Sequence, residues 1–226
     1  MSAHGSAAVR VLAGCTLRTL VVGPLDTNVY LLTCHATGAQ LLVDAADEPD
    51  RLLALIREGS PDGRLDLVVT THRHADHLDA LAAVLSATGA PHAAGAADAR
   101  AVADAAGTEL PRALAHGDRL AVGALTLEVL ALRGHTPGGV ALLLPEREGA
   151  GASSTSTAHL LTGDSLFPGG PGHTAGPADF ASLMTDLTER VFDVLDPGTR
   201  VCPGHGAGTT LGAERPNLPT WWSRGW

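Results

Sequence analysis

The segment from His72 to His77 constrains this chain more than any other. It carries three histidines and one aspartate within six positions, and it follows the apolar run of residues 65–69. A short apolar run of this length is typical of a buried strand. Side chains on the loop after a strand are held by rigid structure, and catalytic groups commonly lie there. The segment therefore predicts a metal-binding cluster at the end of a strand.

Spacing within the segment separates its ligands into two directions. Alternate residues of an extended segment point the same way, so His72 and His74 can converge on one ion. Asp76 and His77 come where the backbone enters a helix, and this change of direction lets them face a second ion. Imidazole and carboxylate together suit zinc, iron or manganese better than calcium or magnesium. We therefore expect two divalent metal ions, with zinc as first choice and iron or manganese as alternatives.

Two ions need more ligands than this segment supplies. His135, Asp164 and His205 each follow an apolar run and lie beside glycine, which lets side chains approach a crowded centre closely. Any one histidine alone is more often a surface or structural residue. Grouping several without a metal costs desolvation and charge repulsion, which favours metal binding for the cluster. The surface or structural reading is kept for His4, His35, His92, His116 and His159.

Length and composition predict a single soluble domain over residues 1–226. Of these 226 residues 45% are hydrophobic and only 3% aromatic, so alanine, valine and leucine must build the core. The formal net charge of −9 disfavours nucleic acid as a partner, because phosphate binding needs a positive surface. No apolar run approaches the roughly 20 residues of a membrane helix. The expected partner is a small-molecule substrate, and the oligomeric state is left open.

The cysteines indicate a reducing compartment. Cys15, Cys34 and Cys202 are scattered and odd in number, which is no disulfide framework. Residues 12–15 have the form of a lipoprotein cleavage site, but the residues before them lack the apolar core that a signal peptide needs. We therefore expect a cytoplasmic protein.

Apolar periodicity and turn residues divide the chain into regular elements. Strands 140–144 and 159–162 are expected to pair as a hairpin around residues 146–157, a Gly-, Ser- and Thr-rich segment typical of a mobile surface loop. Strand-rich halves with interspersed helices indicate an α/β protein with sheets at the centre and helices outside. The other expected strands are 17–22, 29–33, 41–43, 65–69, 119–122, 126–132 and 199–202, and the expected helices are 50–57, 78–87, 96–106 and 180–195.

The ligand pattern resembles that of a known family. His72-x-His74-x-Asp76-His77, followed in order by His135, Asp164 and His205, is similar to the metallo-β-lactamase superfamily, and within it to the glyoxalase II (hydroxyacylglutathione hydrolase) branch. The resemblance runs from residues 26–30 to residues 203–206. It implies a four-layer αββα sandwich, in which two mixed β-sheets are flanked by helices and the metals lie at one sheet edge. It also implies that His72, His74 and His135 hold one metal, that Asp76, His77 and His205 hold the other, and that Asp164 bridges them.

Three departures from the family pattern bear on the substrate. Full-length glyoxalase II carries a helical C-terminal domain that grips glutathione, and residues 207–226 are too few for it, so the chain resembles a compact form. Residues 163–170 open a Gly- and Pro-rich loop over the site, as in compact bacterial homologues. Zinc β-lactamases of the main class carry a cysteine ligand where this chain has Asp164, which argues against an antibiotic-degrading role.

The expected reaction is hydrolysis by a hydroxide that bridges the two metals, whose coordination lowers the pKa of water from 15.7 towards about 7. Asp76 is predicted to be both a ligand and the catalytic residue that orients this hydroxide. A thiolate, with a pKa near 8.5, leaves without strong acid assistance. Because the motif brings no obvious general acid, thioesters, activated esters or lactones are favoured over amides. His173 and Phe180 are candidate substrate contacts in or next to the loop after Phe167.

A mononuclear iron persulfide dioxygenase with the same fold is the alternative. It would hold a single iron through His72, His135 and Asp164, and the motif residues alone do not exclude it. Metal content separates the two activities: one iron with oxygen consumption, against two metals with hydrolysis that needs no oxygen.

Overall fold

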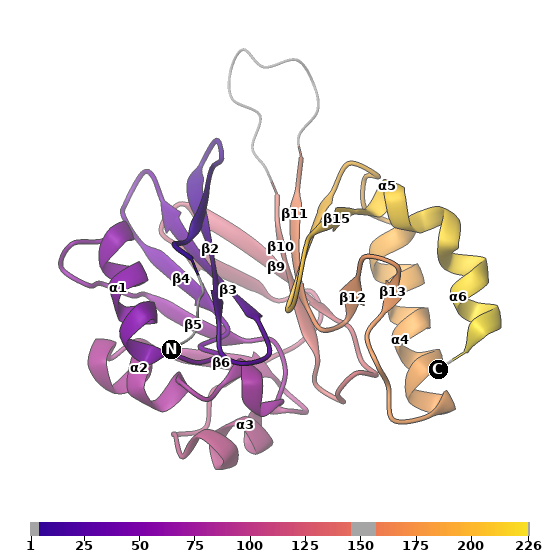
Figure 1. Cartoon of the computed structure of the whole chain (residues 1–226), viewed down its shortest axis with the longest axis horizontal. Coiled ribbons are helices and arrows are strands. Elements are labelled where there is room, and N and C mark those ends of the chain that lie inside the picture. Colours follow the sequence, from indigo (N-terminus) through magenta and orange to yellow (C-terminus); the bar gives the residue numbers. More distant parts are fainter. Residues whose placement is uncertain (1–4, 146–156, 226) are drawn as a thin grey trace.

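A computed structural model of the chain describes residues 5–145 and 157–225. Two β-sheets lie face to face, and helices cover the outer face of each (Figure 1). The surface loop expected at residues 146–157 lies outside the described residues except for Thr157. The four-layer αββα sandwich that the sequence predicted is confirmed, because both sheets are mixed and both are flanked by helices.

The first sheet contains seven strands that follow one another in chain order. Its first four strands pair antiparallel, whereas β4 to β7 run parallel. Parallel neighbours need a crossover connection, and three helices lie on these connections. The strands are β1 (Ala8–Val11), β2 (Cys15–Val22), β3 (Thr27–Cys34), β4 (Gln40–Val43), β5 (Leu67–Thr70), β6 (His92–Gly95) and β7 (Arg112–Leu114), and the helices are α1 (Pro49–Gly59), α2 (Leu81–Thr88) and α3 (Ala99–Ala106).

The second sheet contains six strands in the order β15-β14-β11-β10-β9-β8. Only β11 and β14 run parallel in it, and the expected hairpin of β10 and β11 is present. The strands are β8 (Arg119–Val122), β9 (Leu125–Ala131), β10 (Val140–Leu144), β11 (His159–Gly163), β14 (Arg200–Pro203) and β15 (Thr209–Thr210). A small hairpin of β12 (Leu166–Phe167) and β13 (Gly170–Pro171) follows β11, and the remaining helices are α4 (Pro177–Leu187), α5 (Leu211–Glu214) and α6 (Leu218–Arg224).

Alternation along the strands produces the layers. On β3, Tyr30 and Leu32 join an apolar cluster between the two sheets, whereas Val29 and Leu31 join the cluster beneath α1 and α2. A third cluster fills the space between the second sheet and α4, and it includes Phe192. Every strand residue of a doubly covered sheet can therefore be buried, as all eight residues of β3 are.

Two of the predicted helices include a turn of another helical type. The helix expected over 78–87 is preceded by a separate 3-10 turn at Ala75–His77, and α2 itself begins only at Leu81. The helix expected over 180–195 is α4, which ends at Leu187 and continues as a π-helical turn, Thr188–Phe192. The Thr188 hydroxyl donates to the Met184 carbonyl at 2.7 Å, a local bond that competes with regular helix pairing.

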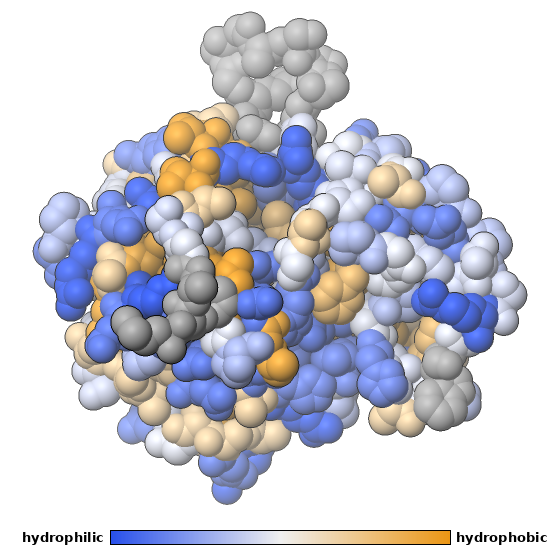
Figure 2. All heavy atoms as spheres, viewed as in Figure 1, coloured by the Kyte–Doolittle hydropathy of each residue, from blue (hydrophilic) through white to orange (hydrophobic). Residues whose placement is uncertain are grey.

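Hydrophilic residues cover most of the face seen in Figure 2, with smaller apolar patches between them. The part of the chain that the structure describes contains no helix long and apolar enough to cross a membrane.

Candidate metal centre

The seven predicted ligands lie on four loops at one end of the sandwich. The 72–77 segment follows β5, His135 follows β9, Asp164 follows β11 and His205 follows β14. Each loop leaves its sheet at the same end, so residues far apart in the chain converge. All seven residues come together in three overlapping groups whose ligand atoms lie within 4.8 Å of one another.

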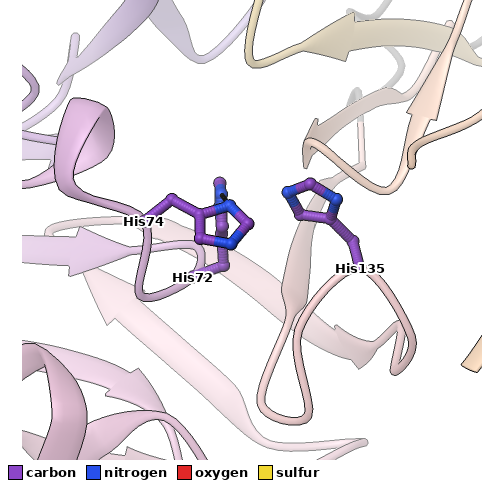
Figure 3. Close-up of side chains that lie close together, drawn as sticks. All are labelled: His72, His74 and His135. Carbon is purple, nitrogen blue, oxygen red and sulfur yellow. Dashed lines mark hydrogen bonds between the residues drawn. The ribbon is translucent and has the colours of Figure 1, made fainter. Parts of the chain in front are cut away.

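The first group consists of His72, His74 and His135. Figure 3 shows the rings of His72 and His74, from one loop, facing the ring of His135 from another. The extended segment after β5 brings His72 Nε2 to 3.1 Å from His74 Nδ1. The prediction that alternate residues converge is therefore confirmed for this pair.

The second group consists of Asp76, His77 and His205. Asp76 and His77 lie in the 3-10 turn rather than at the entrance of an α-helix. This tight turn lets two neighbouring side chains reach the same candidate metal position. His77 Nε2 lies 3.2 Å from His205 Nε2. Asp76 Oδ2 lies 3.2 Å from the same nitrogen of His205 and 3.6 Å from that of His77.

The Asp164 carboxylate lies between the two groups. Its Oδ1 is 3.4 Å from His77 Nε2, and its Oδ2 is 3.5 Å from His205 Nε2 and 3.7 Å from His135 Nε2. One carboxylate thus reaches histidines of both groups, as a bridging ligand must.

A buried carboxylate orients two of the histidines. His77 Nδ1 donates to Asp44 Oδ2 at 2.8 Å. The Thr71 hydroxyl donates to the same oxygen at 2.8 Å and therefore accepts from His72 Nδ1 at 3.0 Å. With Nδ1 protonated in each neutral ring, Nε2 presents a lone pair to the centre. Metal-binding histidines usually have such a partner, because it fixes tautomer and orientation.

Backbone carbonyls orient the other two in the same way. His135 Nδ1 donates to the His173 carbonyl at 2.6 Å, and His205 Nδ1 donates to the Leu25 carbonyl at 2.9 Å. Both rings are left with Nε2 directed at the centre. His135 Nε2 is buried and has no hydrogen-bond partner among residues 5–145 and 157–225.

These side chains fit divalent metal ions. Four histidines have Nδ1 hydrogen-bonded away from the centre and Nε2 directed into it. Two pairs of ring nitrogens stand only 3.1 and 3.2 Å apart. Facing lone pairs at that separation repel, and a buried acceptor without a donor is costly, unless a cation lies among them. Nitrogen and carboxylate donors together are those that zinc, iron and manganese accept.

The histidines of the centre differ in pKa according to whether a carboxylate lies next to the ring. Burial and neighbouring histidines hold the pKa of His72 well below its usual value and lower that of His74. Burial also acts against charge on His77, but Asp44 and Asp164 outweigh it and raise its pKa to about 10. Hydrogen bonds from His205 and His77 overcome the effect of burial on Asp164 and hold its pKa far below normal. The carboxylates therefore create a site that stabilises positive charge.

Close packing explains the glycine before His205. A Cβ on Gly204 would collide with Asp164 Oδ1 and stand 2.7 Å from His77 Cε1. Only a residue without a side chain lets this loop approach two ligands at once.

Supporting residues were missed in the sequence. Asp98 is fully buried and joins the loops of the first group, since it accepts from the Arg73 amide at 3.2 Å and the Gly138 amide at 3.0 Å. No sequence motif indicated a supporting role for Asp98, because it stands in an alanine-rich stretch. Asp44 could have been suspected of a role at the site, because it is a polar residue directly after the strand predicted over 41–43. Its left-handed backbone, with φ of 61°, is the further sign of constraint that only the structure supplies.

The two candidate substrate contacts lie beside the centre. His173 and Phe180 both line a cavity of about 210 Å³, and the His173 carbonyl is the group that orients His135. Arg224 of α6 and Thr174 line the same cavity, and neither was singled out in the sequence. The Thr174 hydroxyl is buried without a hydrogen-bond partner among the described residues. Cys202 lies in β14, as the reading of it as a strand residue required, but it is only half-buried.

Fold and site together define a four-layer sandwich with a histidine- and aspartate-rich centre at its loop end. Residues 22–205 match the model of the metallo-beta-lactamase superfamily, so the chain belongs to that superfamily. This confirms the resemblance drawn from the ligand pattern.

Relatives place the chain more closely. It is 34% identical over 182 residues to a hydroxyacylglutathione hydrolase of Fuscovulum blasticum, which covers 80% of this chain and 62% of that protein. The chain thus spans about three-fifths of the length of this curated relative. Among solved structures, ETHE1 from Myxococcus xanthus is 30% identical with a TM-score of 0.71, covering 90% of this chain and 83% of that one. TTHA1623 in a di-iron-bound form is 34% identical with a TM-score of 0.67, covering 90% and 99%.

Proposed function

We propose that this protein is a binuclear metal-dependent hydrolase of thioesters or of activated esters and lactones. The observation that carries the proposal is the convergence of the seven residues, with the Asp164 carboxylate 3.4 Å from His77 Nε2 and 3.7 Å from His135 Nε2. His72, His74 and His135 would hold one metal, and Asp76, His77 and His205 the other. Zinc is the first choice and iron or manganese the alternatives, and the di-iron form of a similar protein supports a centre with two metals.

The metals, when bound, would supply Lewis acidity and lower the pKa of water towards about 7. The protein's own contribution is to hold the ligands without rearrangement. Asp44, Thr71 and two backbone carbonyls fix four imidazole rings, and Asp164 sets the distance between the groups.

Asp76 is proposed as the catalytic residue that orients the attacking water. Its side chain is 27% exposed, whereas that of Asp164 is only 13% exposed. The Asp76 carboxylate can therefore accept a hydrogen bond from a water that enters from solvent while it stays beside His205. A thiolate leaving group has a pKa near 8.5 and can depart unprotonated, so the reaction needs no general acid to protonate it.

The cavity beside His173 is proposed to receive the organic part of the substrate. Phe180 supplies an apolar wall and packs edge-to-face against Trp222 with ring centroids 6.0 Å apart. The unpartnered Thr174 hydroxyl and Arg224 offer polar contacts. A small apolar cavity with a few convergent polar groups is the usual form of a ligand pocket.

Elemental analysis of protein purified without added metal tests the proposal, with thioester cleavage and oxygen uptake followed on the same sample. We expect about two equivalents of metal and cleavage that needs no oxygen. The variant H205Q should retain one equivalent, whereas H116Q, which changes an exposed histidine outside the centre, should retain two.

The mononuclear iron persulfide dioxygenase is the rival that the same experiment decides. It needs only His72, His135 and Asp164, so the convergence of Asp76, His77 and His205 on a second position favours the hydrolase. One iron per chain with persulfide-dependent oxygen uptake, unchanged in H205Q, would establish the dioxygenase instead.

A further inference from the structure

A groove opens between the two sheets along the side of the sandwich where their edge strands diverge. β1 is the edge of the first sheet and β15 the edge of the second. The groove has a volume of about 530 Å³, and it is lined from one sheet by β1 and β2 and from the other by β14 and β15. We call it the arginine groove, after Arg10 of β1 and Arg200 of β14, which line it from the two sheets.

Strand register places both arginines in the layer between the sheets. Arg10 pairs with Leu17, and Leu17 belongs to the apolar cluster of that layer. On the second sheet, Arg200 lies two residues before Cys202, which packs against the same cluster. Side chains on paired or alternate positions share a face of the sheet. Two guanidinium groups thus occupy positions that apolar side chains fill elsewhere in this layer.

No carboxylate of the described residues neutralises either arginine. Within residues 5–145 and 157–225, Arg10 donates only to His159 Nε2, at 3.3 Å, and Arg200 has no side-chain partner. The groove lining contains no acidic residue, although the chain as a whole carries a net charge of −9. Both arginines lie close enough to the Cys202 thiol to act against the burial that raises its pKa to about 11.

Hydroxyl and amide groups complete the lining. Thr19 of β2 and Thr210 of β15 add a hydroxyl on each wall. The other two polar residues of the lining are already engaged, since Thr209 donates to Glu214 Oε1 at 2.7 Å and the Asn28 amide donates to the carbonyls of Pro203 and Gly206. Two planar guanidinium forks on opposite walls, with hydroxyl donors between them, match the oxygens of a phosphate or of paired carboxylates. Like charges that face each other gain most from an anion that bridges them.

We propose that the arginine groove binds a small oxyanion, a phosphate ester or a dicarboxylate, at a site separate from the metal centre. Arg10 and Arg200 would each form a bidentate contact from its own sheet, and the bound anion would connect the two edges. Its volume of about 530 Å³ leaves room for an organic portion beside the charged group.

Isothermal titration of the metal-loaded protein with inorganic phosphate, and separately with succinate, at constant ionic strength tests this. We expect saturable binding of at least one anion, weakened at least tenfold in R10Q and in R200Q and lost in the double variant. The control R100Q removes the same charge from an exposed arginine of α3 and should bind as the wild type does. Circular dichroism confirms that each variant is folded, and R10K should bind with intermediate affinity because it keeps the charge but not the fork.

Comparing the two anions shows which class of ligand the groove prefers. Tighter binding of phosphate indicates a phosphate ester, and tighter binding of succinate indicates a dicarboxylate. Anion held by the metal centre alone would bind equally well to the double variant, and that result, or the absence of saturable binding to the wild type, overturns the proposal.

Discussion

Polar groups gather in two places on this molecule, the metal centre at the loop end of the sandwich and the arginine groove along its side, and the two are built differently. At the metal centre, carboxylates and histidines alternate, and almost every ring has a second partner that fixes its orientation. In the arginine groove, two guanidinium groups come from different sheets, and no carboxylate of the described residues lies in the lining. A rigid, pre-oriented site suits an ion that must be held in one geometry. A loosely held pair of long side chains suits a ligand that arrives and leaves.

The comparison predicts that the supports of the metal centre matter most for stability. D44A removes the acceptor shared by His77 and Thr71 and leaves a buried imidazole without its counterion. Breaking a buried pair in this way costs about 3–5 kcal/mol. We expect a loss of that order in the free energy of unfolding by urea, together with a fall from two metal equivalents to one. D104A removes an exposed carboxylate and should change neither value, and a D44A protein with full stability and full metal content would contradict this account.

The next largest effect concerns close packing at the centre. In G204A the new methyl group would displace Asp164 or His77, since both lie within its reach. Loss of ligand orientation typically costs 10–100-fold in metal affinity. Competition with a chelator of known affinity measures this change. The control G176A adds its methyl group where no atom lies within 4 Å, and equal metal affinity in G204A and G176A would show that the crowding is relieved at no cost.

A smaller, pH-dependent effect comes from a histidine outside the centre. Burial lowers the pKa of His92 to about 4, while its usual value in an unfolded chain is about 6.5. Between these values the unfolded chain binds the extra proton, so His92 removes stability as the pH falls from 6.5 to 4. Because the ring is partly exposed, we expect about 1–2 kcal/mol rather than the full value of the shift. Below pH 4 the contribution is constant.

Urea unfolding with chelator present, at pH 7 and pH 4.5, measures this slope. H92Q should lose less stability between the two pH values than the wild type does, whereas H116Q, at an exposed position, should behave as the wild type. An unchanged slope in H92Q would mean that other groups account for all of the acid sensitivity.

The smallest effect is expected at the arginine groove. R10Q and R200Q remove exposed side chains that have no carboxylate partner in the described part of the chain, and such changes usually alter stability by less than about 0.5 kcal/mol. Thermal unfolding without added anion checks this. With saturating anion, the wild type should gain stability that the variants do not, because a ligand that binds only the folded state stabilises it. A large loss in R10Q without anion would show that the arginines are structural and would remove the contrast between the two sites.

Much of the fold could be predicted because its strands are strongly apolar or alternate cleanly. Strands such as β3 and β10 can be predicted from their runs of leucine and valine, which are buried in the structure. β6 was missed because His92-Ala-Ala-Gly95 has little side chain to reveal it, and β1 because all four of its residues are exposed. These strands exist because a neighbour supplies hydrogen bonds to their backbone, which is a tertiary effect.

The metal ligands were identified from sequence because their residue types are rare and their spacing is dense. The extended backbone over His72 and His74 follows from the chain itself, and the positions of His135, Asp164 and His205 follow from the resemblance to a family. Asp44 and Asp98 could not be found in this way, since a buried carboxylate that orients a ligand looks in sequence like any other aspartate.

By itself, the sequence determined the fold class and the identity of the candidate ligands, because both depend on residue type and on spacing along one chain. Only the tertiary structure decided how close Asp164 lies to histidines of both groups, which groups fix the imidazole rings, and that Arg10 and Arg200 line one groove. Residues separated by more than a hundred positions meet there. Such meetings depend on which strands pair and in which register, and local sequence does not encode them.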